Sequence, residues 1–237
     1  MEKNKLTNNV LITGANRGMG LGYVRDYLKK GYSVVVTAKN PSMAEELAEL
    51  QKEFRDRLSL HKLDVTDEKA INDFVDQLMR KELSFSIVIN NAGIAYEEEF
   101  GKWTMATFEK HFRVNTIGPA LVSQAISHFL EKGAKIIQIS SGMGSLEWNI
   151  NPENGLDAYS ASKSALHSIT IRLAEKLRAQ GIMVVAINPG WVRTAMGGTD
   201  ATSSVEDAVE DITKTIDALT LDDSGRFLSE KGASIPW

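Results

Sequence analysis

The sequence has no cysteine among its 237 residues, which excludes disulfide bonds and thiolate chemistry. It also lacks an apolar run long enough to span a membrane, so no membrane partner is expected. The formal net charge of −4 leaves no basic surface typical of nucleic-acid binding. The four histidines show no metal-ligand spacing, so we predict no metal, and we expect His128 and His167 on helix surfaces.

The composition is that of an ordinary globular protein, with 43% hydrophobic and 24% charged residues. A chain of this length suits a single domain, which we assign to residues 1–237. Residues 1–5 are polar and lead directly into the first apolar run, so we expect no signal peptide. Together with the missing cysteines, this favours a cytoplasmic location.

Strand and helix patterns alternate along the chain, which predicts an α/β protein: a Rossmann-type doubly wound parallel sheet of about seven strands in three α/β/α layers. Strands are expected near 9–13, 33–38, 58–63, 86–90, 134–140, 182–188 and 226–228. Helices are expected near 18–30, 42–54, 67–82, 104–131, 157–180 and 204–219.

A glycine-rich turn follows the first predicted strand and opens the first predicted helix. Its spacing is G-x-x-x-G-x-G, and it lacks the Lys-Ser/Thr ending of a nucleoside triphosphate loop. Backbone N–H groups and a helix N-terminus at such a turn can bind a pyrophosphate; the alternative is a structural turn that lets a helix pack closely. The candidate cofactor residues are Gly14, Asn16, Arg17, Gly18, Met19 and Gly20.

Tyr159 and Lys163 lie four residues apart in a helical pattern and therefore share one helix face. An ammonium beside a phenol favours the phenolate and is expected to lower the tyrosine pKa toward the working range. Such a pair can exchange a proton with an alcohol or carbonyl oxygen. Alone, the spacing is commonplace on solvated helices.

Three further polar sets occur upstream, and two of them follow predicted strands. Asn90-Asn91-Ala92-Gly93 comes after the apolar run 87–89, and Ser140-Ser141 comes after 136–139, whereas Asn115 lies within a helical stretch. Ligands of open α/β sheets bind beyond the carboxyl ends of the strands, so we expect these residues to converge on one crevice.

In these motifs the chain resembles the short-chain dehydrogenase/reductase family, in its compact single-domain form. The resemblance covers most of the chain in the family's order and includes Pro189-Gly190 followed by Thr194. The ending, with 224–228 and 235–237, is similar to the C-factor/sniffer-like branch of carbonyl reductases.

The resemblance implies a role for each candidate catalytic residue. Tyr159 would be the general acid in reduction and the base in oxidation, and Lys163 would lower its pKa and bind the nicotinamide ribose. Ser141 would hydrogen-bond the substrate carbonyl, and Asn115 would maintain a helix irregularity and a water link to Lys163. Ser140 is the rival to Ser141, which is preferred because Gly144 follows it at the S-x-x-G spacing.

The resemblance also implies the remaining cofactor contacts. Asp64 would accept a hydrogen bond from the adenine amino group with help from the Val65 backbone; the alternative for Asp64 is a helix cap. The adenine-side ribose would lie against Asn91, Ala92 and Gly93. The nicotinamide would be wrapped by Pro189, Gly190, Val192 and Thr194.

The expected cofactor is NADP(H). A site specific for NAD usually carries an acidic residue after the second strand, which binds the ribose 2′-hydroxyl. Here that stretch has no acid, whereas Lys39 follows the strand and Arg17 lies in the glycine turn. Both cations can converge on a 2′-phosphate; the alternative is that they are solvated surface charges.

The predicted function is therefore reversible, NADPH-dependent reduction of a ketone or aldehyde. Segments 144–157 and 195–204 are interpreted as substrate walls rather than plain surface loops. A medium-sized, fairly apolar substrate is suggested by the short substrate loop and by Met143, Trp148, Ile150 and Met196. The resemblance implies a homodimer or homotetramer. The competing hypothesis is a dinucleotide-binding signalling or regulatory protein of the C-factor type, and a nucleotide-sugar epimerase is disfavoured because no C-terminal substrate domain is evident.

Overall fold

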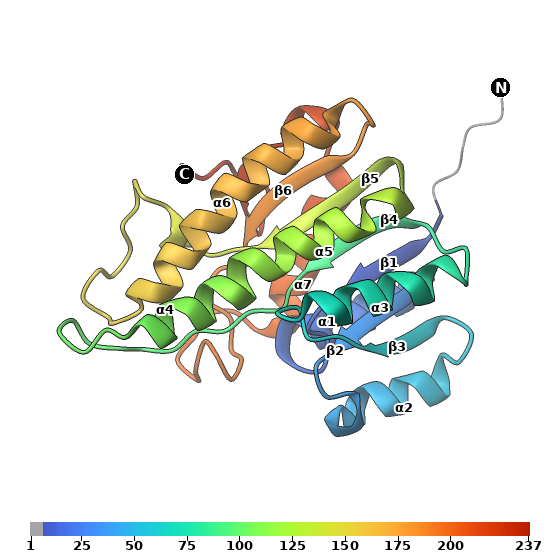
Figure 1. Cartoon of the computed structure of the whole chain (residues 1–237), viewed down its shortest axis with the longest axis horizontal. Coiled ribbons are helices and arrows are strands. Elements are labelled where there is room, and N and C mark those ends of the chain that lie inside the picture. The colour runs from blue at the N-terminus through green and yellow to red at the C-terminus, as the bar shows by residue number, and fades with distance from the viewer. Residues whose placement is uncertain (1–6) are drawn as a thin grey trace.

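Seven parallel strands form one sheet in the computed structural model, which describes residues 7–237 (Figure 1). The order across the sheet is β3-β2-β1-β4-β5-β6-β7, so the winding direction reverses between β1 and β4. This confirms the predicted doubly wound sheet. The strands are β1 (Asn9–Ile12), β2 (Ser33–Ala38), β3 (Leu58–Lys62), β4 (Phe85–Asn90), β5 (Leu130–Ile139), β6 (Met183–Asn188) and β7 (Phe227–Ser229).

Helices cover both faces of the sheet and make three layers (Figure 1). One face packs against α1 (Gly18–Lys29), α2 (Glu45–Glu53) and α7 (Val205–Ala218), and the other packs mainly against α3 (Glu68–Met79), α5 (Gly118–Ile126) and α6 (Asp157–Arg178). The remaining helix, α4 (Met105–Phe112), contacts α6.

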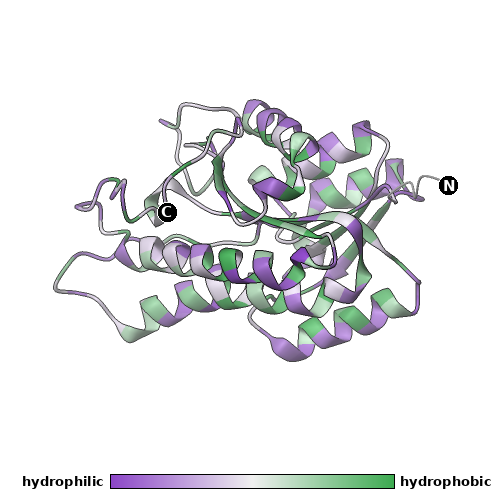
Figure 2. Cartoon of the chain, turned by 90° about the horizontal axis from the view of Figure 1, so that it is seen from above, coloured by the Kyte–Doolittle hydropathy of each residue, from purple (hydrophilic) through white to green (hydrophobic). Residues whose placement is uncertain are grey.

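The central strands are apolar on both faces because each face is covered by helices. β4 is buried along its whole length, and alternate residues of β1 enter different clusters: Ile12 packs toward α1 and α7, and Leu11 toward α3 and α5. Figure 2 shows hydrophobic strands at the centre of the molecule and surrounding helices whose residues alternate between hydrophobic and hydrophilic.

The predicted helix 104–131 is wrong in its continuity and its end. The chain instead forms α4, a π-helical turn at Arg113–Ile117, α5 and a short 3₁₀ turn at Ser127–Phe129, and then enters β5 at Leu130. Pro119 explains the irregularity, because its missing N–H cannot bond the carbonyl four residues earlier, that of Asn115. The other predicted elements agree with the structure to within three residues at each end, except that β5 begins at Leu130, four residues before the predicted start at 134.

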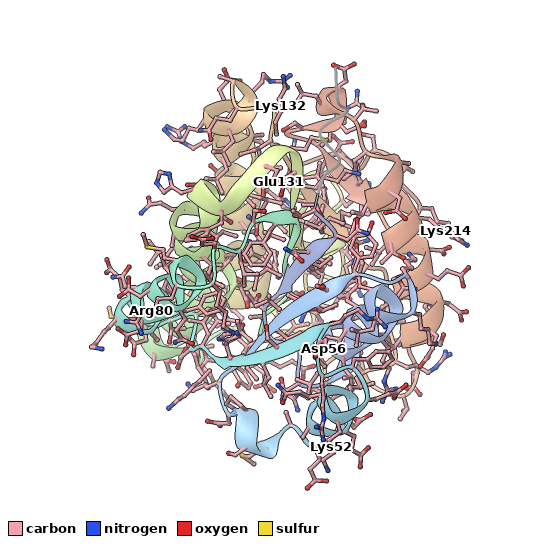
Figure 3. The ribbon with its side chains drawn as sticks, turned by 90° about the vertical axis from the view of Figure 1, so that its right-hand side faces the viewer. Lys52, Asp56, Arg80, Glu131, Lys132 and Lys214 are labelled. Carbon is pink, nitrogen blue, oxygen red and sulfur yellow. The ribbon has the colours of Figure 1, made fainter. Side chains whose placement is uncertain are left out.

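The carboxyl ends of β1 and β4 lie side by side at the reversal point, where ligands of such sheets bind. The opposite edge presents the amino ends of the strands, and Figure 3 views it with Lys52, Arg80 and Lys132 pointing outward. Within residues 7–237, no helix combines the length and apolarity needed to cross a membrane.

Gly20 and Gly22 offer a matched pair of substitutions on α1. A Cβ at Gly20 would collide with the Gly14 carbonyl and lie 2.6 Å from the Asn91 amide nitrogen; one at Gly22 would meet only the Val205 and Val209 side chains, at 2.7 and 2.9 Å. We expect Gly20→Ala to lower the free energy of unfolding by about 3 kcal/mol and Gly22→Ala by about 1 kcal/mol, because backbone yields less than side chains. Urea unfolding checks this, and equal losses would contradict it.

Candidate active site

The glycine turn is packed directly against the end of β4. Gly14 adopts a φ of +64°, and a Cβ there would lie 2.7 Å from the Cα of Ala92. The Asn91 amide donates to the Thr13 and Gly14 carbonyls, at 3.0 and 2.9 Å, and the Thr13 hydroxyl accepts from the backbone N–H groups of Asn91 and Ala92. The structure therefore packs two predicted motifs tightly together, the glycine turn after β1 and the asparagine-containing loop after β4.

The N-terminus of α1 lies beside these contacts and has no side-chain cap. Arg17 occupies the N-cap position with an extended backbone, and its side chain makes no capping hydrogen bond. The first N–H groups of a helix have no intrahelical acceptors, and the helix dipole favours a negative charge there. Asn16 and Arg17 are exposed beside it. These features fit a dinucleotide pyrophosphate.

The predicted acid and its serine lie together. Tyr159 is buried in the first turns of α6, and its hydroxyl interacts with the Ser141 side chain. Burial raises the pKa of Tyr159, and the contact with Ser141 opposes this rise only in part. The expected lowering of the Tyr159 pKa is therefore wrong for this structure, in which desolvation dominates. A phenol in such surroundings keeps its proton near neutral pH.

Lys163 is buried one turn after Tyr159, with its ammonium 5.7 Å from the centre of the tyrosine ring. The ammonium donates a 2.8 Å hydrogen bond to the carbonyl of Ile139. No salt bridge among residues 7–237 includes Lys163. Burial lowers the pKa of Lys163 to about 8, so the side chain is charged at neutral pH at a desolvation cost.

Asn115 lies in the π-helical turn, as the predicted helix irregularity requires. Its Oδ1 accepts from the Ile94 N–H, and its Nδ2 donates to the Ile94 carbonyl and the Ser162 hydroxyl, all at 2.9–3.0 Å. A Cβ at Gly93 would lie 3.4 Å from this Oδ1 and 3.9 Å from the Lys163 ammonium. Asn115 thus holds the loop after β4 against α6; its predicted water link stays a prediction.

Several residues that position the site were not predicted. Ser160 and Ser164 of α6 donate to the carbonyls of Met143 and Gly144, at 2.7 and 2.8 Å, and hold the segment after Ser141. Asn188 accepts hydrogen bonds from the backbone N–H groups of Gly142 and Gly190, which ties the ends of β5 and β6 together. The only signal in the sequence that could have indicated these residues is the repetition of serine within 160–164, and serine is too common in helices to be diagnostic.

Two histidines lie closer to the site than expected. His167 is buried rather than on a helix surface, because its face of α6 packs against the sheet; His128 is exposed, as predicted. His111 is also buried, 6.5 Å from the Tyr159 ring between ring centres. Its Nδ1 bonds the Thr107 carbonyl, so that its Nε2 accepts from the Tyr96 N–H. Among residues 7–237, no three acidic or histidine side chains cluster as metal ligands.

The predicted residues after β6 lie beside the glycine turn. A Cβ at Gly18 would lie 3.4 Å from the Thr194 methyl, and the Thr194 hydroxyl accepts from the N–H of Gly197. Val192 is buried and bridges to Ser203. Pro189 is half-buried and Gly190 exposed at the start of this loop. The loop thus runs from the end of β6 to the N-terminus of α1.

The predicted adenine end shows an ion pair. The Lys39 ammonium lies 2.7 Å from a carboxylate oxygen of Asp64, whose other oxygen accepts from the backbone and hydroxyl of Thr66. The helix cap is Asp67, not Asp64. Val65 packs against Gly118: a Cβ at Gly118 would lie 2.9 Å from the Val65 side chain. The pairing lowers the pKa of Asp64 and raises that of Lys39.

Segment 144–157 lies over the residue next to Ser141. A Cβ at Gly142 would meet Ile150 at 2.9 Å and Trp148 at 3.3 Å. In segment 195–204, the Arg193 guanidinium bonds the carbonyls of Ala201 and Thr202. Both segments therefore make defined contacts, and segment 144–157 lies next to the candidate catalytic residues. Their role as substrate walls stays a prediction.

This arrangement is shared with known proteins. Residues 8–205 match the family described as short chain dehydrogenase. The chain belongs to this family. It is 33% identical over 252 residues to the short chain dehydrogenase gsfK of Penicillium aethiopicum, covering 96% of this chain and 98% of the relative. It is also 36% identical over 159 residues to C-signal of Myxococcus xanthus, covering 64% and 92% of the two chains.

Solved structures of carbonyl reductases show the same fold. The NADPH-bound carbonyl reductase from chicken fatty liver superposes with a TM-score of 0.92 at 33% identity, covering 98% of this chain and all of the other. The carbonyl reductase Sniffer of D. melanogaster gives 0.91 at 30% identity with the same coverage. The predicted resemblance to this branch is confirmed, and the chain is an oxidoreductase of the short-chain dehydrogenase family.

Because the charge of Lys163 is buried, we predict that removing it stabilises the folded protein. Lys163→Met removes the ammonium and keeps a long side chain, so without cofactor at pH 7 the melting temperature should rise, by about 2–4 °C for each kcal/mol of desolvation cost that the variant avoids. In the wild type, the Lys163 ammonium loses its proton near pH 8 in the folded state and near pH 10.4 in the unfolded state. Wild-type stability should therefore increase between these values, and the gap between the proteins should narrow. A constant gap from pH 7 to 10 would contradict this.

Proposed function

We propose that the protein is an NADPH-dependent carbonyl reductase whose whole chain, 1–237, acts as one dinucleotide-binding and catalytic domain. The observation that carries the proposal is the buried Tyr159 hydroxyl beside Ser141, with Lys163 one turn further along α6. This group lies at the sheet edge that also presents the glycine turn. The 0.92 TM-score with an NADPH-bound carbonyl reductase supports the same assignment.

Bound NADPH supplies the hydride that reduces the carbonyl carbon to an alcohol. The residues of this chain handle the oxygen. Ser141 donates a hydrogen bond that holds and polarises the carbonyl, and Tyr159 gives its proton to the oxygen as negative charge develops. The raised pKa of Tyr159 suits this direction, because the phenol stays protonated until it donates. Alcohol oxidation runs the same steps in reverse, with the phenolate as base.

Lys163 has two tasks in this proposal. Its charge stabilises the phenolate that forms when Tyr159 loses its proton. Its ammonium has hydrogen-bonding capacity beyond the bond to Ile139, since it carries three donors, and these can reach the nicotinamide ribose. Asn115 maintains this geometry by holding the Ile94 backbone and the Ser162 hydroxyl.

The remaining site residues are proposed to bind the dinucleotide. The uncapped N-terminus of α1 and the turn 14–20 would hold the pyrophosphate, and the loop 189–194 would hold the nicotinamide. The loop 91–93 and the Asp64-Val65 pair would hold the adenosine. Arg17 and Lys39 would bind a 2′-phosphate; since the Lys39 side chain is 71% exposed, it could leave Asp64 for the phosphate.

The substrate is proposed to be a medium-sized, fairly apolar ketone or aldehyde bound against Trp148, Ile150 and Met196. These side chains are partly exposed near the catalytic group or in the neighbouring loop. We also propose a cytoplasmic homodimer or homotetramer. The signalling alternative rests on the likeness to C-signal, and turnover of NADPH with a panel of simple ketones discriminates between the two.

Tyr159→Phe tests the chemistry. The variant removes the proton donor and keeps the ring, so turnover should fall at least ~100-fold, whereas NADPH affinity should change little. Steady-state kinetics and cofactor fluorescence measure the two quantities. Near-normal turnover would exclude Tyr159 as the acid.

The cofactor preference is tested by the double variant Arg17→Ala, Lys39→Ala. Wild type should have a much lower Michaelis constant for NADPH than for NADH, because two cations surround the 2′-phosphate. The double variant should lose most of this preference while its use of NADH is retained. Lys52→Ala, at the opposite edge of the molecule, is the control (Figure 3). Equal use of both cofactors by wild type would refute the assignment.

A further inference from the structure

A buried hydrogen bond joins α6 to the end of β5 just before Ser141. The Ser140 hydroxyl lies 2.7 Å from Nε2 of His167, and both side chains are almost fully buried. Ser140 is the residue before Ser141. His167 lies four residues after Lys163, one turn further along α6. Neither residue is used by the proposed chemistry, which leaves this pair without an assigned role.

Three functional side chains of α6 recur at intervals of four residues and line one buried face: Tyr159, Lys163 and His167. Each contacts a different point of one short segment. Tyr159 meets the Ser141 side chain, Lys163 bonds the Ile139 carbonyl, and His167 bonds the Ser140 side chain. Residue 139 at the end of β5 and the next two residues, 140 and 141, are therefore held by three successive turns of α6.

The far side of His167 is closed by aromatic rings. Its ring centre lies 4.2 Å from that of Phe227 in β7 and 5.0 Å from that of Trp237. A Cβ at Gly144 would lie 2.8 Å from Cε1 of His167 and equally close to Lys163. These contacts restrict the position of the imidazole ring. They also explain the glycine at 144 of the S-x-x-G motif, because the ring and Lys163 leave no room for a side chain there.

The imidazole also stays uncharged. Burial, and then the charge of Lys163, lower the pKa of His167 to about 4. A neutral ring can share one proton with the Ser140 hydroxyl without placing a second cation beside Lys163.

We propose that His167 is a positioning residue of the active site: through its hydrogen bond to Ser140, it sets the end of β5 and so keeps the Ser141 hydroxyl in reach of Tyr159. The effect on catalysis rests on the proposed reductase function, but the effect on the segment 139–144 does not. A serine displaced by a fraction of an ångström would polarise the carbonyl less well, which reduces turnover more than substrate or cofactor binding.

The test compares four variants with wild type. His167→Phe keeps an aromatic ring and removes the hydrogen bond, Ser140→Ala removes it from the other side, and a double variant removes both partners. His167→Gln restores a neutral polar group near the Nε2 position. His128→Phe makes the same chemical change at an exposed histidine and is the matched control.

We expect His167→Phe and Ser140→Ala each to lower kcat about tenfold with little change in the Michaelis constant for NADPH. The double variant should lose no more than either single one, because both remove the same bond, and His167→Gln should recover part of the loss. Additive losses, or an unchanged kcat with only a lower melting temperature, would overturn the proposal.

Hydrogen exchange of the peptide containing 139–144 gives a second readout that needs no activity. Exchange should be faster in His167→Phe and Ser140→Ala than in wild type and His128→Phe, and near normal in His167→Gln. Unchanged exchange would overturn the positioning role whatever the kinetics. Failure of wild type to reduce any carbonyl, with the exchange result as expected, would count against the reductase function alone.

Discussion

A lysine ammonium held out of water at the carboxyl end of β5 is the constraint on which the rest of the site depends. Removing a charge from water is costly, and within residues 7–237 the Lys163 ammonium makes a single hydrogen bond, to the Ile139 carbonyl. Such a group stays buried only where its surroundings are rigid. α6 supplies that rigidity, because the side chains of Ser160, Ser164 and His167 hold the segment that follows Ile139. A costly buried charge of this kind is typical of functional sites, which supports the proposed role of Lys163 in proton transfer.

Backbone contacts supply the second constraint. Gly14, Gly20 and the Asn91 amide let the first turn approach the end of β4 more closely than side chains permit. The same contacts leave the start of α1 open, since Arg17 does not cap it. The contacts confirm the alternative of a structural turn that packs closely, and the open helix start leaves the cofactor site as a prediction.

The ion pair between Lys39 and Asp64 lies where the adenine end of the cofactor is proposed to bind. Asp64 accepts from Thr66 and pairs with Lys39, and each group shifts the pKa of the other toward the charged form. An exposed pair of this kind contributes little to stability. It does keep Lys39 beside the place where a 2′-phosphate is proposed to bind, and the lysine gives up little when it changes partner.

The sequence by itself determined the family and the sheet, and it named the candidate site residues. Glycine spacing, the tyrosine–lysine interval and the strand-end asparagines and serines are local patterns that survive without coordinates. Only the tertiary structure decided which residues support them. The burial of His167, the π-helical turn around Asn115 and the pairing of Lys39 with Asp64 join residues that are tens of positions apart or depend on which helix face meets the sheet. The rise in the Tyr159 pKa has the same origin, since desolvation is a property of the packed interior and not of a motif.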